Sequence, residues 1–496
     1  MTVVKVTDMI INMKAVTLLV VATLPNVVNA QTSAIDEFNR TRQEMLGDYR
    51  NFRKSVLDGY DNYLKEVWKE YKTFKGKVRD HNPKPKTLPN IEEQPAMAPM
   101  EDLPSVDVRP KETTPEKKKP MVQPVPTVVP GIPQQSVECS FYGVSVKVPR
   151  LEGVGMNDFS PEQTADAWRA YEGKGIAKKA LDIKNRAELL GLNDWFTYEM
   201  VRECVNAQCD KCSVAERVTM MLYLLANMGY DVRMALANNE PCLLIAMRQQ
   251  VYGRGYTVID GKKYYIYNVD GGQPKDGGSL YTYSLPKDME MGREMDMRIV
   301  QAMRICNDDG KVHYCQLEYG DITVTANVDI VQMEMLRHYP QMDIAQYAMS
   351  VVSPQLRQSV LEQIKPQIKG LTKSKAAEKL LRFVQFAFDY ATDGEQHGYE
   401  KAYFFEENFY YPKNDCEDRA IFYAYLVRHL LGLDVHLVNF PGHECTAVCF
   451  EDDNVDGTGY MYNGKKYIIC DPTYIGASIG QCMPQYRGVT PKVETF

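Results

Sequence analysis

Three residues near the C-terminus have the types and the spacing that acyl transfer by a thiol requires. Cys416, His443 and Asp471 follow one another at intervals of 27 and 28 residues. In such chemistry a thiolate attacks the acyl carbon and an imidazole takes and returns the proton, while a carboxylate on the other ring nitrogen fixes the orientation of the imidazole. The sequence therefore predicts a cysteine nucleophile, a histidine base and an aspartate that orients the base.

Each of these residues begins or ends a predicted element. Cys416 begins a helical run whose apolar residues recur at three- and four-residue steps as far as Gly432, which is typical of a C-cap. At a helix start, unpaired N–H groups and the helix dipole lower the pKa of a thiol. His443 begins a strand after a Pro-Gly turn, and Asp471 ends a strand over residues 467–470. A helix start and two successive strands can bring the three side chains together.

The order and context of these motifs resemble the transglutaminase-like superfamily of papain-type cysteine enzymes, in its secreted or periplasmic bacterial type. The matching segments are Asn414-Asp415-Cys416-Glu417-Asp418, Gly442-His443-Glu444-Cys445-Thr446-Ala447-Val448 and Ile469-Cys470-Asp471-Pro472-Thr473-Tyr474. The resemblance covers the last third of the chain and implies a catalytic triad of Cys416, His443 and Asp471. We expect neither a metal nor another cofactor at this site.

Residues just before Cys416 are candidates for binding the substrate. The oxyanion hole should include the backbone N–H of Cys416, with Asn414 or Tyr411 as a second donor. The preceding segment is rich in aromatic residues. Candidates for a groove wall there are Tyr403, Phe405 and Tyr410. The alternative is that these rings pack the cysteine helix onto the body of the domain.

The chain also contains an internal duplication. Gly229-Tyr230-Asp231-Val232 matches Gly432-Leu433-Asp434-Val435, and Gly261-Lys262-Lys263-Tyr264 matches Gly464-Lys465-Lys466-Tyr467, both at an offset of 203 residues. Such a constant offset indicates repeated structural units. Further upstream the offset falls to 179, which predicts an insertion of 24 residues in the second copy, within residues 391–414.

The first copy lacks the residues of the triad. At the offset of 203 the matching positions are Ser213, beside Cys212, for Cys416; Glu240 for His443; and Asn268 for Asp471. No histidine occurs anywhere in residues 136–300. We therefore expect the first copy to be a degenerate module with a structural or binding role.

The N-terminal region predicts export and a tether. Residues 1–30 carry a lysine, a short apolar run and a small-residue cleavage site, which together predict a signal peptide and a mature chain in the periplasm or at the cell surface. The run is too short to span a membrane. Residues 31–81 predict a long amphipathic helix, because an aromatic pattern repeats every eleven residues over 35–80. Residues 82–135 are rich in proline and predict an extended linker.

The predicted helix over 35–80 carries an aromatic stripe, which we expect to pack against another surface. Self-association or a partner protein is the favoured interpretation, and a helix folded back on the main body is the alternative. The predicted architecture is α+β: two tandem transglutaminase-like modules, over 136–300 and 301–496, follow the helix and the linker. A net charge of −7 gives no reason to expect a nucleic-acid partner.

Twelve cysteines in an exported chain raise the question of disulfides. Cys306 and Cys315 flank a turn and are the best candidate pair. Cys204, Cys209 and Cys212 have a spacing that suggests a metal or redox site, but no histidine lies near them. Buried thiols or a local disulfide are the preferred interpretation of these three.

Three functions remain open at this stage. The favoured one is an exported cysteine hydrolase that cleaves amide bonds of peptides or proteins through a thioester. The second is a cross-linking acyltransferase, in which an amine resolves the same thioester. The third is a binding or assembly protein in which both modules are scaffolds.

Overall fold

The structure is a computed structural model. It describes residues 136–274, 279–282, 292–306, 310–451 and 455–496, together with the backbone of 72–74, 78–79 and 107–109. By compactness the chain divides into the units Met1–Glu66 and Val67–Phe496, and all described residues belong to the second. They form helices and mostly antiparallel sheets, which confirms the predicted α+β class. The predicted signal peptide lies outside the described residues.

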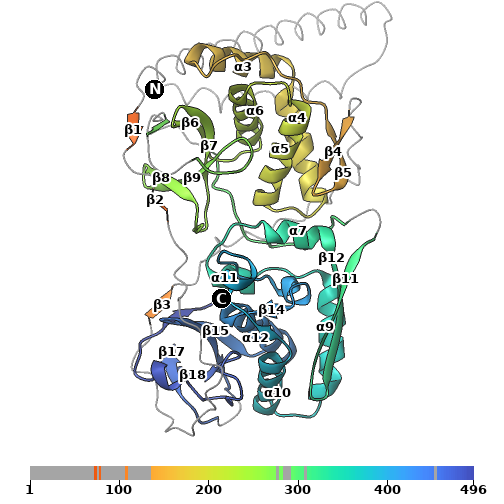
Figure 1. The fold of residues 1–496 in the computed structure, drawn as a ribbon, viewed down its shortest axis with the longest axis vertical. Coiled ribbons are helices and arrows are strands. Elements are labelled where there is room, and N and C mark those ends of the chain that lie inside the picture. Colours follow the sequence, from red (N-terminus) through yellow and green to blue (C-terminus); the bar gives the residue numbers. More distant parts are fainter. Residues whose placement is uncertain are drawn as a thin grey trace, which may run out of the picture. The chain divides into compact units, whose positions relative to one another are not determined.

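The described residues form two successive sets of elements, coloured orange to green and cyan to blue in Figure 1. The first set is β4 (Ser136–Phe141), β5 (Val144–Pro149), α3 (Pro161–Gly173), α4 (Ile176–Leu189), α5 (Asp194–Gln208), α6 (Val214–Asn227), β6 (Val232–Ala237), β7 (Glu240–Ala246), β8 (Gly255–Ile259), β9 (Lys262–Tyr267) and β10 (Leu280–Thr282). The second set is β11 (Val312–Tyr319), β12 (Ile322–Asp329), α7 (Ile330–Arg337), α8 (Ile344–Ala348), α9 (Pro354–Ile368), α10 (Lys373–Phe386), β13 (Asp389–Tyr390), α11 (Asp393–Gln396), the 3₁₀ helix η1 (Phe405–Phe409), β14 (Lys413–Asn414), α12 (Cys416–Leu431), β15 (Asp434–Phe440), β16 (His443–Cys449), β17 (Gly459–Tyr462), β18 (Lys465–Cys470), the 3₁₀ helix η2 (Pro484–Tyr486) and β19 (Lys492–Glu494).

The two large sheets repeat the same strand order. The first sheet runs β1-β10-β6-β7-β9-β8-β2, and the second runs β17-β18-β16-β15-β19-β3. Starting at β8, the first sheet runs β8-β9-β7-β6-β10, and starting at β17, the second runs β17-β18-β16-β15-β19. Strands at the same place in these two orders correspond to each other. In the first set helix α6 packs on β6 and β7, and in the second set helix α12 packs on β15 and β16 (Figure 1).

The strand register repeats as well. Val232 pairs with Ile245 across β6 and β7, and Val435 pairs with Val448 across β15 and β16, so both residue numbers increase by 203. The pairings of β7 with β9 and of β8 with β9 recur at the same offset in β16–β18 and β17–β18. Since a slip of one residue moves every side chain to the other face, an equal register means that corresponding residues face the same way.

The turns that close the matched hairpins have the same form. Asp260-Gly261 joins β8 to β9, and Asn463-Gly464 joins β17 to β18. All four residues have positive φ, between 49° and 81°. This is the conformation of a type I′ turn, which favours Asn-Gly and Asp-Gly because few other residues adopt positive φ without strain. The turn residues therefore explain why these short motifs matched in the sequence.

The helices before the sheets repeat at the smaller offset. The N-cap residues Asn193 of α5 and Thr372 of α10 differ by 179, and each accepts a backbone hydrogen bond from the residue three positions later. The connection to the following helix is residues 209–213 in the first set and residues 387–415 in the second. The second connection is therefore 24 residues longer, and it contains β13, α11, η1 and β14.

The N-terminal predictions need correction where the structure describes the backbone. Residues 72–74 form β1, which pairs with β10, and 78–79 form β2, which pairs with β8, so the predicted helix does not include these five residues. Backbone pairing at the two open edges of a sheet outweighs the helical pattern there. Residues 107–109 form β3, parallel to β19, so the proline-rich linker is interrupted by a strand.

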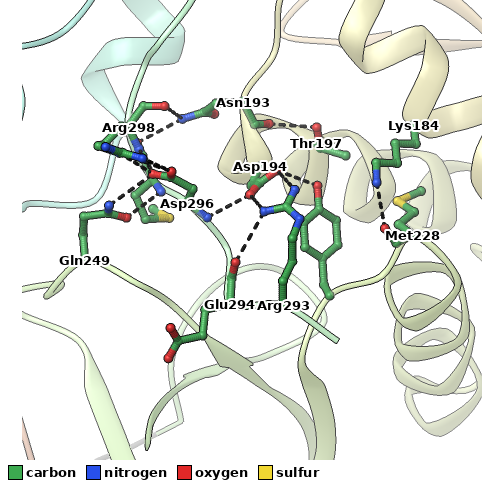
Figure 2. A network of polar contacts seen from close by, with 12 residues as sticks. Lys184, Asn193, Asp194, Thr197, Met228, Gln249, Arg293, Glu294, Asp296 and Arg298 are labelled. Carbon is green, nitrogen blue, oxygen red and sulfur yellow. Dashed lines mark hydrogen bonds and ion pairs between the residues drawn. The ribbon is translucent and has the colours of Figure 1, made fainter. Parts of the chain in front are cut away.

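A polar network secures the segment that follows β10. Figure 2 shows Asp194, the first residue of α5, accepting hydrogen bonds from the guanidinium of Arg293 at 2.5 and 2.7 Å and from the backbone N–H of Asp296 at 2.8 Å. Beside it, Asn193 Nδ2 donates to the carbonyl of Met297 at 3.0 Å. The start of α5 thus fixes residues 293–297, because a bidentate Arg–carboxylate pair permits little rotation.

No helix among the described residues is long and apolar enough to cross a membrane.

Candidate active site

Cys416 is the first residue of α12 and is 7% exposed. The residue before it, Asp415, has extended backbone and acts as the N-cap, and its N–H donates to Asp418 Oδ2 at 3.2 Å. The Cys416 thiol donates to Glu417 Oε2 at 3.3 Å. Two influences therefore oppose each other at this sulfur: the helix start favours a thiolate, and the neighbouring carboxylate favours the thiol.

His443 and Asp471 form a direct buried pair. His443 is the first residue of β16, and Asp471 directly follows β18, the neighbouring strand. His443 Nε2 lies 2.7 Å from Asp471 Oδ2, and the two side chains are 0% and 2% exposed. Among the described residues His443 Nδ1 has no hydrogen-bond partner. With Nε2–H directed to the carboxylate, the neutral ring offers a bare Nδ1 that can accept a proton.

The carboxylate of Asp471 is fixed on its other side too. Asp471 Oδ1 accepts from the backbone N–H groups of Thr473 and Tyr474, both at 2.9 Å. Gln385, on α10, donates through Nε2 to the carbonyls of Asp471, Tyr474 and Ala477 at 3.0, 3.0 and 2.9 Å. One buried amide therefore holds the whole turn that carries the aspartate, which in turn limits the rotation of His443.

A buried guanidinium joins the cysteine helix to α10. Arg419 lies three residues after Cys416 and is 1% exposed. It donates to Asn414 Oδ1 at 2.9 Å, to the carbonyl of Gln385 at 3.2 Å and to the carbonyl of Phe388 at 2.9 Å. Burial lowers the pKa of this guanidinium to about 10. Arg419 thus connects the residue before Asp415 with the end of α10, and it fixes both ends of the inserted segment.

Two tyrosines that the sequence analysis did not select lie at the site. The ring of Tyr486, in η2, stacks on His443 with centroids 5.4 Å apart and planes 5° apart. Burial raises the pKa of Tyr486 to about 12, and the negative charges of Cys416 and Asp471 act in the same direction. Burial raises the pKa of Tyr390 far above its usual value, and the charge of Cys416 adds to this effect. Cys416 and Asp471 are therefore both close enough to Tyr486 to influence its hydroxyl.

The predicted oxyanion donors occupy other roles. Asn414 Nδ2 donates to Asn408 Oδ1 at 2.9 Å, while its oxygen accepts from Arg419. The ring of Tyr411 packs edge-on against that of His397 at 4.9 Å, and its buried hydroxyl has no hydrogen-bond partner among the described residues. None of the hydrogen bonds of these two side chains goes to Cys416.

The predicted groove residues are largely buried. Phe405 is 2% exposed and stacks on Phe422 of α12 at 4.9 Å, and Tyr403 is 1% exposed with its N–H donating to Asp418 at 2.8 Å. Tyr410 is half-buried and packs against His313 at 5.1 Å. These contacts match the alternative interpretation, in which the aromatic segment packs the cysteine helix onto the body.

Carboxylates surround the start of α12. The side-chain oxygens of Asp393, Asp415 and Asp418 lie within 4.8 Å of one another, and so do the ligand atoms of Asp415, Cys416 and Glu417. All five residues are buried. Oxygen donors at such separations could hold a hard divalent cation. The sequence analysis did not identify this cluster, because Asp393 lies in the inserted segment.

The described cleft does not coincide with the triad. It has a volume of about 590 Å³ and is lined by residues of the 302–306 segment, the β11–β12 hairpin, α7, the start of α9 and Glu406. Burial raises the pKa of Glu406 to about 7, and its Oε1 accepts from the N–H of Ser353 at 3.2 Å. Cys416, His443 and Asp471 are not among the residues that line it.

The corresponding region of the first set lacks the same chemistry. Glu240 is exposed, and Asn268 Oδ1 is buried without a hydrogen-bond partner among the described residues. Helix α6 begins at Val214, so the residue at the position of Cys416 within its helix is Val214, and Ser213 is the N-cap. No nucleophile, base and orienting carboxylate converge at these positions.

All twelve cysteines are free thiols in the structure, so the predicted disulfide between Cys306 and Cys315 is not formed there. Cys306 and Cys315 are both free thiols, the first exposed and the second half-buried. They lie on either side of residues 307–309, which are outside the described part of the chain.

Comparisons with known proteins give no match: none of the family models, curated proteins or solved structures that were compared resembles the chain.

Proposed function

We propose that the chain is an exported cysteine hydrolase with two tandem transglutaminase-like modules, of which only the second is catalytic. The observation that carries this proposal is the buried His443–Asp471 pair, which leaves Nδ1 of the imidazole bare at the end of a strand packed against α12. Cys416, at the start of the same helix, is the only residue of the predicted triad that can act as a nucleophile.

The proposed reaction proceeds through a thioester. His443 Nδ1 accepts the proton of Cys416, and the sulfur attacks the carbonyl carbon of an amide. The backbone N–H of Cys416 donates to the oxyanion, and the imidazolium then protonates the leaving amine as the C–N bond breaks. Water, deprotonated by His443, attacks the thioester and releases the acid and the thiol. Peptides or proteins are the substrate class that the resemblance implies.

Labelling with iodoacetamide tests the nucleophile. We expect Cys416 to be alkylated faster than the other buried cysteines, and His443→Ala to slow its alkylation by roughly a hundredfold. His429→Ala is the matched control, because His429 lies on the exposed end of α12 and should leave the rate unchanged. Equal rates at Cys416 and Cys445, unaffected by His443→Ala, would rule out this mechanism.

The fate of the acyl group requires a second experiment. A glutamine-containing peptide should give the glutamate product, and an added primary amine should leave the product unchanged. Incorporation of the amine would instead indicate the cross-linking alternative, in which the same thioester transfers its acyl group to an amine.

The burial of the triad favours one competing function, that of a binding or assembly protein. Cys416, His443 and Asp471 are 7%, 0% and 2% exposed, and the ring of Tyr486 covers the imidazole. Catalysis therefore requires the segment around η2 to move. Tyr486→Ala should then increase alkylation of Cys416; if neither this variant nor the wild-type protein reacts, the binding function is the better conclusion.

A further inference from the structure

Four cysteines of the first set of elements lie in two close pairs. Cys139, on β4, and Cys204, on α5, are 4% and 2% exposed, and their thiols share a hydrogen bond. The position of Cys139 against α5 is also fixed by Gln208, whose Nε2 donates to Cys139 Sγ at 3.7 Å. Cys204 and Gln208 are one helical turn apart and share a face, so both contacts place the same sulfur on that face.

The second pair closes a turn between two helices. Cys209 is the C-cap of α5, and the N–H of Cys212 donates to its carbonyl at 3.0 Å. Such a turn brings the two Cα atoms within about 7 Å. The Cys209 thiol donates to Met220 Sδ at 3.7 Å, and Cys212 Sγ packs closely against Gly153.

Two other buried thiols donate to main-chain oxygens. Cys242 Sγ donates to the carbonyl of Ala235 at 3.5 Å, and Cys470 Sγ donates to that of Ile468 at 3.6 Å. Both are fully buried in the strands of their sheets. These two residues therefore provide internal controls: they are as buried as Cys139 and Cys204, but their sulfurs are directed at main-chain oxygens.

We propose that the first module is a site of oxidation, in which Cys139 bonds to Cys204 and Cys209 bonds to Cys212. Each pair loses two protons and two electrons as its S–S bond forms, and a disulfide donor of low molecular mass, such as oxidised glutathione, is reduced to two thiols by exchange. The proposal rests on the export part of the proposed function, because exported proteins meet an oxidising environment.

A thiolate is the attacking species in disulfide exchange. In each pair one cysteine displaces a thiol from the donor and forms a mixed disulfide, and its partner then displaces the second thiol of the donor.

Differential labelling of the purified full chain tests the pairing. The protein is incubated with oxidised glutathione, its free thiols are blocked with N-ethylmaleimide under denaturing conditions, and the remaining disulfides are reduced and labelled with iodoacetamide. We expect the second label on Cys139, Cys204, Cys209 and Cys212, and the first label on Cys242 and Cys470. If N-ethylmaleimide modifies all four of these cysteines, none of them was in a disulfide and the proposal is overturned.

Single variants test the connectivity. In Cys139→Ser we expect Cys204, and no other paired cysteine, to become a free thiol that N-ethylmaleimide modifies. In Cys209→Ser we expect the same of Cys212 alone, and Cys242→Ser should change neither pair. If Cys139→Ser also frees Cys209 or Cys212, the assigned pairing is wrong. Should a variant not fold, the tryptic peptides of the wild-type protein give the pairing directly, because a Cys139–Cys204 bond links two peptides that reductant separates.

This test is independent of the chemistry at Cys416. Reactive Cys416 without the two bonds would contradict only the disulfide proposal, and the two bonds without reactive Cys416 would contradict only the proposed catalysis. The same labelling on protein taken from its native compartment tests export: bonds that form with oxidised glutathione but are absent there would contradict the exported location.

Discussion

The two sets of elements, called the first and second module below, differ far more in their reactive residues than in the contacts that support them. In the first module Asn206 Nδ2 donates to the carbonyl of Val269 at 2.9 Å and its oxygen accepts from Arg217 at 3.2 Å. In the second module Gln385 binds the turn at Asp471, and Arg419 binds the carbonyl of Gln385. An amide and an arginine therefore connect the same elements in both modules, whether or not a triad is present.

A second matched contact lies on the sheets. The Tyr264 hydroxyl donates to the Asp231 carboxylate at 3.0 Å, and the Tyr467 hydroxyl donates to Asp434 at 2.6 Å. Both residues of the second pair are 203 positions after those of the first. The first module has these contacts although it lacks the residue types of Cys416, His443 and Asp471, which indicates that the contacts serve folding.

The largest expected effect comes from the buried arginine of the second module. Arg419→Met leaves three acceptors without donors and removes the positive charge beside Asp415 and Asp418, so we expect a loss of about 3–5 kcal/mol in the free energy of unfolding. Arg217→Met, at the half-buried counterpart, should cost about 1 kcal/mol. Urea unfolding followed by circular dichroism measures both, and equal losses would contradict the comparison.

The second largest effect is expected from Gln385, whose side-chain amide binds the turn at Asp471. Gln385→Ala removes three donated hydrogen bonds and two accepted ones, from Gly476 and Arg382, and leaves buried carbonyls unpaired, for an expected loss of roughly 3 kcal/mol. Alkylation of Cys416 should slow as well, because His443 loses its fixed partner. Asn206→Ala is the control, with an expected loss of about 1 kcal/mol and no change in that rate. An unchanged alkylation rate in Gln385→Ala would show that this amide does not position the triad.

Much of the fold and part of the site could be predicted from the sequence, because local chemistry dictates them. Asp260-Gly261 and Asn463-Gly464 recur because a two-residue hairpin turn needs positive φ at both positions. The pairing of His443 with Asp471 follows from their places at the ends of neighbouring strands. A difference in the lengths of the two connections was visible as a change of offset.

Other features depend on tertiary contacts that no local pattern records. Tyr486 reaches His443 from a segment without periodicity, and the aromatic residues before Cys416 would look the same in a core or in a groove. Cys139 and Cys204 are 65 positions apart, so their spacing carries no sign of their contact. The strands at 72–74 and 78–79 take their conformation from the edges they pair with.

A smaller effect should appear on acidification and should be specific to the second module. His436 stacks on Tyr467 at 3.8 Å and accepts from or donates to the Tyr460 hydroxyl at 2.9 Å; burial lowers the pKa of His436 to about 4. Its counterpart at the offset of 203 is not a histidine but Arg233, which lies over the ring of Tyr264.

The direction of this pH effect follows from comparing the protonation of His436 in the folded and the unfolded chain. The unfolded chain binds a proton on His436 near pH 6.5, whereas the folded chain resists it down to about pH 4, so stability decreases as pH falls between these values. At pH 4.5 we expect His436 to account for about 2 kcal/mol of the loss. Comparing the unfolding free energies of wild type and His436→Phe at pH 7 and pH 4.5 isolates this share from that of His429, whose pKa burial also lowers to about 4. An identical pH dependence in the variant would contradict the assignment.

The smallest effect is expected where the triad is grafted onto the first module. Val214→Cys, Glu240→His and Asn268→Asp place the three residue types at the helix start and the strand ends that match Cys416, His443 and Asp471. Even so, we expect the new cysteine to be alkylated no faster than an ordinary exposed thiol. Val214 is 41% exposed and Glu240 is also exposed, whereas Cys416 and His443 are 7% and 0% exposed, so the grafted groups would be directed to solvent.

The graft thereby tests what the inserted segment contributes. In the first module residues 209–213 connect α5 to α6. In the second module the longer connection, residues 387–415, covers the start of α12 with buried aromatic and acidic side chains. The matched control is the double variant Val214→Cys with Asn268→Asp, which keeps Glu240. If adding Glu240→His speeds alkylation of the grafted cysteine at pH 7, then residue identity alone makes the site and the insertion is not needed for it. Equal rates in the double and triple variants would instead mean that burial by the inserted segment is what brings sulfur and imidazole into reach.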